Sequence, residues 1–186
     1  PAPLGRPAGS AGPSAPPSRG SRAAATARRS ARPRGRRSAA SGAACTVVRT
    51  AWLFGPGGSN FVTKINNAAS AAAGRDEPLR VVSDEWGNPT WTPGLADALV
   101  ELMGRDEPPP EILHLAGEPA TTRFGWAEEV IRAASLETSL RAISSAEYVR
   151  ESVPPRRAIL AMDLARSLGV RPIEWRSPLG DYVRTL

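Results

Sequence analysis

The residues with the clearest capacity for ligand binding lie in the first third of the chain, around Trp52. Thr46–Val48 is a run of β-branched residues that favours a strand. Gly55–Gly58 can continue neither a strand nor a helix, and apolar residues at helical spacing begin at Phe61. Open α/β sheets bind ligands where a strand leads through such a loop into a helix. Trp52 occupies that end of the strand, so we expect it to line a site; the alternative is a place in the hydrophobic core.

Other side chains that could do chemistry are isolated in the sequence. His114 is the single histidine and lies in an apolar run, so a structural role is favoured over a catalytic or ligand role. The acidic residues do not cluster at the spacing of metal ligands, and we expect no metal site. Arg156 and Arg157 follow two prolines and could meet a pyrophosphate. A solvated surface pair is the favoured explanation for these two arginines.

After residue 45, segments with strand and helix patterns alternate, which indicates an α/β fold. Strands are expected at 79–82, 111–117 and 140–143, and a helix at 60–73. Further helices are expected to start at side chains that commonly cap helices. These caps are Thr92, Thr122, Asp163 and Ser177.

Residues 1–45 differ from the rest in composition and charge. They are almost wholly Ala, Arg, Pro, Ser and Gly, and they hold nine arginines and no acid. Residues 46–186 keep 15 basic side chains against 18 acids, a net charge of −3 although the whole chain carries +6. Residues 1–45 bury too little apolar surface to fold, so we expect disorder. A tail or frame error is the favoured origin, ahead of a polyanion-binding arm and a targeting segment. The start at Pro1 instead of Met indicates processing or a fragment.

Six motifs occur in succession along residues 46–186. They are Val48–Gly58 with Asn60–Phe61, Leu79–Asp84, Gly87–Thr90, Leu95–Asp97, His114–Gly117 and Trp175–Arg176. In this order they resemble the C-terminal half of the dTDP-4-dehydrorhamnose reductase family of extended short-chain dehydrogenases/reductases. No single motif identifies the family, but the six motifs in this order are together specific for it.

The resemblance implies a partial Rossmann-like fold, in which residues 46–186 form the end of a parallel sheet and a smaller α/β substrate-binding domain. It implies reduction of the 4-keto group of a dTDP-deoxysugar in dTDP-rhamnose biosynthesis. Trp52 matches the tryptophan that lines the deoxysugar pocket, and its flat apolar ring suits a deoxyhexose face. Glu85 and Trp86 stand where relatives carry Gln and a smaller residue. Residues expected to border the nucleotide, with helix capping as the alternative for the first, are Asn60, Phe61, Gly87, Pro89 and Thr90.

The cofactor chemistry of the family does not map onto this chain. The family binds NADPH with a Gly-rich loop, and a Tyr-x-x-x-Lys pair supplies the proton. Four residues after Tyr148 and Tyr182 stand Ser152 and Leu186, and no Gly-x-Gly-x-x-Gly occurs. We therefore expect NADPH to be the family's cofactor, its binding site to be absent from this chain, and the chain alone not to turn over.

Three functional hypotheses follow from the sequence. The first is a truncated or frame-damaged NADPH-dependent reductase; the second is a non-catalytic binding or regulatory module with a basic N-terminal arm. The third is a reading frame whose product does not accumulate. One cysteine excludes an intrachain disulfide, and no apolar run is long enough to span a membrane, so we expect a soluble cytoplasmic protein. A homodimer is compatible with the resemblance, and nucleic acid and membranes are not expected partners.

Overall fold

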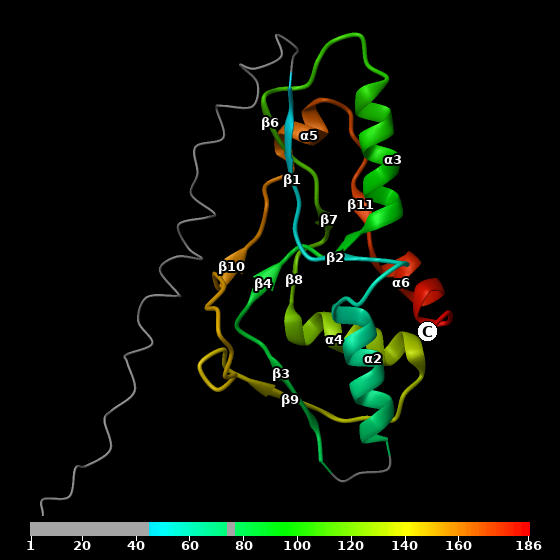
Figure 1. The fold of residues 1–186 in the computed structure, drawn as a ribbon, viewed down its shortest axis with the longest axis vertical. Coiled ribbons are helices and arrows are strands. Elements are labelled where there is room, and N and C mark those ends of the chain that lie inside the picture. The colour runs from blue at the N-terminus through cyan, green and yellow to red at the C-terminus, as the bar shows by residue number, and fades with distance from the viewer. Residues whose placement is uncertain (1–44, 74–76) are drawn as a thin grey trace, which may run out of the picture. The chain divides into compact units, whose positions relative to one another are not determined.

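The computed structural model describes residues 45–73 and 77–186, so the disorder expected for residues 1–45 lies outside the described residues apart from Cys45. The expected α/β class is confirmed, with helices and short strands alternating along the chain (Figure 1). The helices are α2 (Phe61–Ala72), α3 (Thr92–Met103), α4 (Arg123–Ala134), α5 (Asp163–Ser167) and α6 (Arg176–Val183). The strands are β1 (Val47–Arg49), β2 (Leu53–Phe54), β3 (Leu79–Val82), β4 (Trp86–Gly87), β5 (Thr90–Trp91), β6 (Ile112–His114), β7 (Gly117–Glu118), β8 (Thr121–Thr122), β9 (Leu140–Ile143), β10 (Arg157–Ala158) and β11 (Ile173–Glu174).

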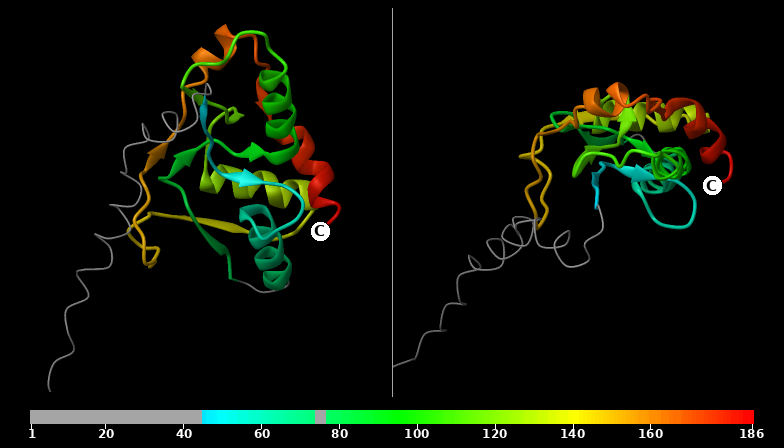
Figure 2. Two further views of the ribbon diagram at one scale, coloured as in Figure 1. Left: turned by 45° about the horizontal axis from the view of Figure 1, so that its top comes forward. Right: turned by 90° about the horizontal axis from the view of Figure 1, so that it is seen from above.

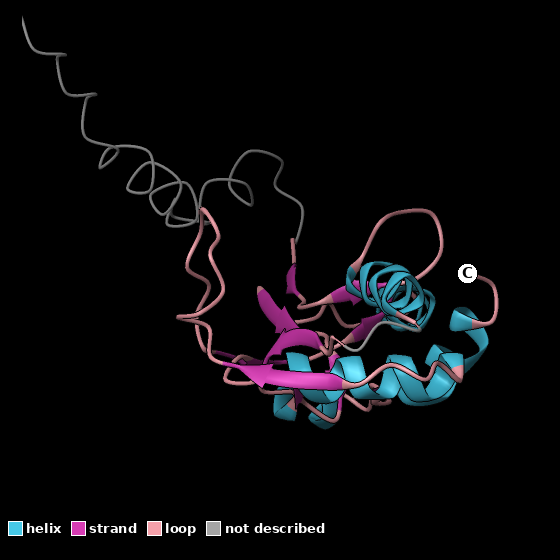
Figure 3. Cartoon of the chain, turned by 90° about the horizontal axis from the view of Figure 1, so that it is seen from below, coloured by secondary structure: helices cyan, strands magenta, loops and turns pink. Residues whose placement is uncertain are grey.

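Most strand pairs are parallel. β1 pairs with β6, β2 with β5, β3 with β9 and β7 with β11 in this way. β4 is parallel to β10 on one side and antiparallel to β8 on the other. The parallel partners are far apart in sequence because a parallel pair needs a crossover connection between its strands. Figure 3 shows the short strands interspersed with helices instead of joined in one broad sheet.

One hydrophobic core lies among α2, α4 and α6, which pack on one another beside β3 (Figure 1). The apolar faces of these helices meet there because their buried residues recur at helical spacing. Trp126 and Trp175 are among the largest fully buried side chains of this core. The Trp175 indole Nε1–H donates to the Pro119 carbonyl oxygen at 2.8 Å, which satisfies its one polar group.

A second core joins α3, α5 and β6, and the left view of Figure 2 shows α3 beside the strands that it covers. Leu95 and Leu102 of α3 and Leu113 of β6 are buried there. Trp91, the last residue of β5, packs against both cores. The segment that leads from β4 to α3 is therefore held between two apolar clusters. Among the described residues, no helix has the length and apolar character needed to cross a membrane.

The strands expected at 79–82 and 140–143 are confirmed as β3 and β9, and the helix at 60–73 is confirmed as α2 within one residue at each end. The expected strand at 111–117 divides into β6 and the first residue of β7. Two residues separate these two short strands, and each strand pairs with a different partner.

The expected helix starts are partly wrong. Thr122 is confirmed as a cap, because its side chain accepts a hydrogen bond from the Gly125 N–H at 2.9 Å. Thr92 and Asp163 are instead the first helical residues, and no side chain caps α3 or α5. Local sequence identifies residues that favour a helix start, but the tertiary position of the preceding strand decides which residue begins the helix.

The expected cap at Ser177 is also wrong, because α6 begins at Arg176. The Glu174 carboxylate accepts hydrogen bonds from the Arg176 N–H at 2.6 Å and the Ser177 N–H at 2.8 Å. A carboxylate at this position satisfies free amides and complements the positive end of the helix dipole.

The backbone of β7 lies directly against the segment that precedes α3. The Gly117 N–H donates to the Thr90 hydroxyl oxygen at 2.9 Å, and the Asn88 side-chain amide donates to the Gly117 carbonyl oxygen at 2.8 Å. A Cβ atom on Gly117 would lie 1.7 Å from the Pro89 carbonyl oxygen. Only glycine permits this approach, which fixes the segment from Asn88 to Thr90.

We predict that Gly117→Ala lowers the free energy of unfolding by about 1–3 kcal/mol or more, because the new methyl group forces backbone apart. Gly104→Ala is the matched control, since a Cβ there would meet no atom closer than 3.7 Å. Urea denaturation of the two variants measures the difference. Equal unfolding midpoints would contradict the described contact.

Candidate functional site

Trp52 lies in the left-handed backbone region, with φ of 42°, immediately before β2. This conformation is unfavourable for a bulky residue and persists only where surrounding structure holds it. The Trp52 carbonyl oxygen accepts a hydrogen bond from the Thr90 N–H at 3.0 Å, and the next two residues pair with β5. Trp52 as a whole residue is partly buried. The strand pairing thus fixes a strained tryptophan at the end of the parallel pair.

The Trp52 ring belongs to an aromatic cluster. It stacks on Trp126 with 5.6 Å between ring centroids and 6° between planes, and Phe61 stacks on Trp126 at 4.6 Å. Phe54 meets Trp126 edge-on at 5.6 Å. A Cβ atom on Gly87 would lie 2.4 Å from Cε2 of Trp52, so the ring rests on the backbone of β4. These contacts leave the Trp52 ring little freedom to turn.

A guanidinium group also covers the Trp52 ring. Cζ of Arg123 lies 4.3 Å from the Trp52 ring centroid and 5.3 Å from that of Phe61, a geometry that favours cation–π attraction. Nε of Arg123 is 3.3 Å from a carboxylate oxygen of Glu85. Arg150 pairs with the same carboxylate. Glu85 is only 2% exposed, and burial of this charge is tolerable because two cations face it.

The segment that carries Arg150 connects β9 to β10 and stands out from the strands and helices (yellow to orange in the right view of Figure 2). It is anchored at Ser145, whose N–H and hydroxyl donate to the Asp84 carboxylate at 2.8 and 3.0 Å. Burial raises the pKa of the Asp84 carboxyl, but the Ser145 hydrogen bonds and the Arg156 charge outweigh burial and leave the pKa below its usual value.

The Asn60 side chain is fully used in shaping the loop and starting α2. Its oxygen accepts hydrogen bonds from the N–H groups of Val62 and Thr63. Its amide donates to the carbonyl oxygens of Gly55 and Gly58 and to the Tyr182 hydroxyl, the last at 2.9 Å. Helix capping, which the sequence offered as the alternative for this residue, is the role visible in these contacts.

Pro89 and Thr90 lie beneath the surface. Thr90 is completely buried, and its hydroxyl donates to the Asn88 carbonyl oxygen at 3.0 Å while accepting from Gly117. Of the six expected site residues, the structure brings Trp52, Phe61 and Gly87 together at the aromatic cluster. The remaining three, Asn60, Pro89 and Thr90, lie in the segments that hold this cluster.

His114, Arg156 and Arg157, the other candidates from the sequence, each contact different residues. His114 Nδ1 lies 3.2 Å from the Ala161 carbonyl oxygen, to which it donates. Arg156 is 3.8 Å from Asp84, and Arg157 stacks over Trp86 with Cζ 5.7 Å from the ring centroid. Within residues 45–73 and 77–186, no three His, Cys, Asp or Glu side chains gather as a metal site.

Sequence reasoning missed Arg123, Trp126 and Arg150. Trp126 was recognisable, because it stands one residue before Ala127 and four before Val130 on the apolar face of α4. The two arginines gave no local signal, because their shared partner Glu85 is 38 and 65 residues away in sequence.

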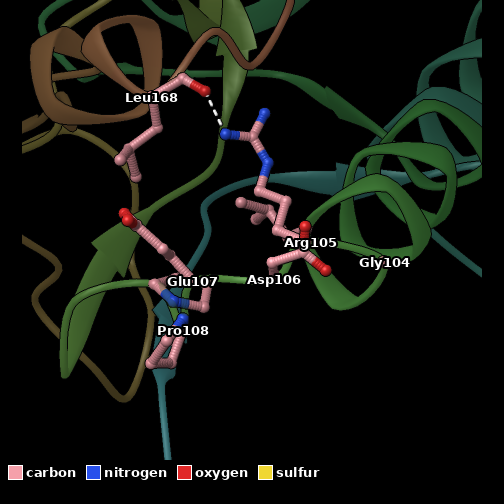
Figure 4. Close-up of a pocket in the computed structure, with 8 residues that line it drawn as sticks. Gly104, Arg105, Asp106, Glu107, Pro108 and Leu168 are labelled. Atoms are coloured by element: carbon pink, nitrogen blue, oxygen red, sulfur yellow. Dashed lines mark hydrogen bonds between the residues drawn. The ribbon is translucent and has the colours of Figure 1, made fainter.

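A hollow of about 500 Å³ opens at the end of α3 (Figure 4), and none of the residues that line it belongs to the aromatic cluster. Residues of the Gly104–Pro109 loop and Leu168 line it. The Arg105 guanidinium donates to the Leu168 carbonyl oxygen across this hollow, which joins the loop to the end of α5. No aromatic side chain lines the hollow, in contrast to the surroundings of Trp52.

Comparison with known proteins identifies the family. The family model described as the RmlD substrate binding domain matches residues 35–186. The chain belongs to this family. A spore coat polysaccharide biosynthesis protein, SpsK of Bacillus subtilis, is 32% identical over 139 residues, which are 75% of this chain and 47% of that protein. A dTDP-4-dehydrorhamnose reductase of Streptomyces griseus is 33% identical over 138 residues, 72% of this chain and 44% of the relative.

Solved structures of the RmlD family share the fold. A dTDP-4-dehydrorhamnose reductase of Clostridium acetobutylicum has a TM-score of 0.66 and 25% identity, over 75% of this chain and 48% of that one. One from Bacillus anthracis, in complex with NADP, has a TM-score of 0.64 and 22% identity over the same shares. The chain thus spans about half the length of the relatives that it matches. The family resemblance read from the six motifs is confirmed.

We predict that Gly87→Ala displaces the Trp52 ring, because the added methyl group would occupy the space of the ring atoms. The near-ultraviolet circular dichroism, which reports fixed aromatic side chains, should weaken. Gly58→Ala is the control, since a Cβ there meets nothing within 4 Å. An unchanged aromatic signal in Gly87→Ala would refute the described packing.

Proposed function

We propose that this chain is the sugar-nucleotide-binding portion of an RmlD-type reductase that acts on a dTDP-deoxysugar. The observation that carries the proposal is the Trp52 ring, fixed at the end of a parallel strand pair in a partly buried residue. A fixed aromatic side chain is a common apolar contact for a sugar ring, and the Arg123 guanidinium over it adds a polar group beside that contact. The similarity to proteins named as dTDP-4-dehydrorhamnose reductases supports the substrate class.

Within this proposal, the six expected residues have different roles. Trp52 and Phe61 contribute ring surface, and Gly87 admits the Trp52 ring to its position. Pro89 and Thr90 hold the segment behind the ring, and Asn60 holds the loop that follows it. In the same proposal, residues 46–186 form the binding region.

Reduction of the 4-keto group by NADPH is the reaction that family membership suggests, and a relative of known structure binds NADP. Neither tyrosine of this chain fits the tyrosine that donates the proton in the family. The Tyr182 hydroxyl is buried and accepts a hydrogen bond from Asn60, and Tyr148 is about half exposed beneath Arg150. Neither tyrosine has a lysine four residues later, so we assign no proton-transfer step to them.

A second candidate function is a binding or regulatory module that takes the sugar nucleotide without reducing it. Both candidates share one ligand and one site. The proposal also includes a cytoplasmic location, with which the single free cysteine accords.

We predict that Trp52→Ala weakens binding of dTDP-rhamnose about 30-fold, because removing a central aromatic contact costs about 2 kcal/mol. Isothermal titration calorimetry on the 186-residue chain measures this. Trp86→Ala is the control, since Trp86 is 39% exposed and stacks only with Arg157 among the described residues. Equal losses in the two variants would argue against a sugar site at Trp52.

We also predict that the chain does not oxidise NADPH in the presence of a dTDP-4-keto-6-deoxysugar. The reason is the lack of both a Tyr-x-x-x-Lys pair and a Gly-x-Gly-x-x-Gly loop in the sequence. Absorbance at the NADPH band follows the reaction. Turnover that depends on the sugar would reject the binding-module alternative and reveal a different proton donor.

A further inference from the structure

The ion cluster beside Trp52 consists of Arg123, Arg150 and Glu85, and its net charge is +1. Arg123 and Arg150 both pair with Glu85, and neither has another ion-pair partner within the described part of the chain. Two guanidinium groups, which stay charged at all ordinary pH values, therefore face a single carboxylate. The described residues as a whole are acidic, so this excess of positive charge is local.

The exposure of the three side chains differs in a consistent way. The Glu85 side chain is 2% exposed, whereas those of Arg123 and Arg150 are 25% and 24% exposed. The carboxylate thus lies beneath the two cations, which reach the surface. The two cations make burial of the carboxylate tolerable, and together the three groups keep a net charge of +1 near the surface.

Arg123 also has unused hydrogen-bond donors. Its Nε–H donates to Glu85, and its two terminal nitrogens donate to no atom of residues 45–73 and 77–186. A guanidinium anchored through Nε presents its terminal N–H groups as a planar fork, which matches the oxygens of a phosphate or carboxylate. By contrast, Arg132 of the same helix uses both Nε and a terminal nitrogen on Glu129.

The position of Arg123 adds to the positive potential. It is the first residue of α4, where the helix dipole favours an anion, and the first turn of α4 contains no acid. Its Cζ lies 4.3 Å from the Trp52 ring centroid, so a ligand that reaches this ring also reaches the guanidinium.

We propose that Arg123 and Arg150, held by the buried Glu85, form an oxyanion subsite beside Trp52. This subsite takes a phosphate or carboxylate group of the sugar nucleotide, and the inference rests on the proposed function because both concern one site. Glu85 is a positioning residue that fixes the two guanidinium groups, and Trp52 and Phe61 hold the Arg123 guanidinium flat.

The test measures binding of inorganic pyrophosphate, glucuronate, thymidine and thymidine diphosphate to the full chain by calorimetry at low salt. The variants are Arg123→Gln and Arg150→Gln, with Arg132→Gln as the control because that side chain is 73% exposed on the same helix. Thermal melts followed by circular dichroism establish that each variant is folded. If Arg150→Gln does not fold, the test depends on Arg123→Gln. In that variant the buried Glu85 carboxylate still pairs with Arg150, so its charge stays balanced.

We expect an oxyanion to bind the unaltered chain and Arg132→Gln equally, and to bind Arg123→Gln about 10-fold or more weakly, the usual effect of losing a charge-assisted hydrogen bond. Affinity should fall as salt is added, because the contact is between charges at the surface. Loss of pyrophosphate binding assigns the subsite to phosphate, and loss of glucuronate binding assigns it to a sugar carboxylate. Thymidine affinity should not change.

Two other results separate this inference from the proposed function. If thymidine diphosphate binds but Arg123→Gln leaves the affinity unchanged, the oxyanion subsite is wrong and the sugar-nucleotide site stands. If pyrophosphate binds through Arg123 but Trp52→Ala has no effect on dTDP-rhamnose, the subsite stands and the proposed function fails. Absence of any oxyanion binding overturns the subsite.

Discussion

The contact between the Trp52 ring and the backbone of β4 constrains everything else at this site. A side chain at position 87 would overlap the ring, and the Thr90 N–H holds the Trp52 backbone in its left-handed conformation. A strained residue of this kind is stable only when several contacts fix it together. Because both the backbone and the ring are held, the direction of the indole is determined before any ligand arrives. Such preorganisation lowers the entropic cost of binding.

The aromatic cluster transmits this constraint to the core. Trp126 is 1% exposed and contacts Trp52, Phe61 and Phe54, so the ring at the surface rests on a fully packed interior. Trp91 continues the packing to the second core. A change in either core therefore reaches the site through rigid aromatic contacts, because close-packed interiors transmit strain readily.

The ion cluster beside Trp52 depends on the burial of one carboxylate, that of Glu85. The charge of Glu85 requires cations nearby if it is to be buried. Arg123 and Arg150 meet that requirement from two segments that are remote in sequence. Although residues 46–186 are acidic as a whole, the charge beside Trp52 is locally positive.

The sequence by itself determined the α/β class, the strands β3 and β9, the helix α2, the cap at Thr122 and the family, because each depends on local pattern or ordered motifs. It also singled out Trp52 by its place after a strand. Only the tertiary structure decided that α6 starts under the Glu174 carboxylate and that Trp52 stacks on Trp126 beneath Arg123. These features join residues that are far apart in the chain or depend on the direction of side chains, and neither hydrophobic spacing nor capping preference carries that information.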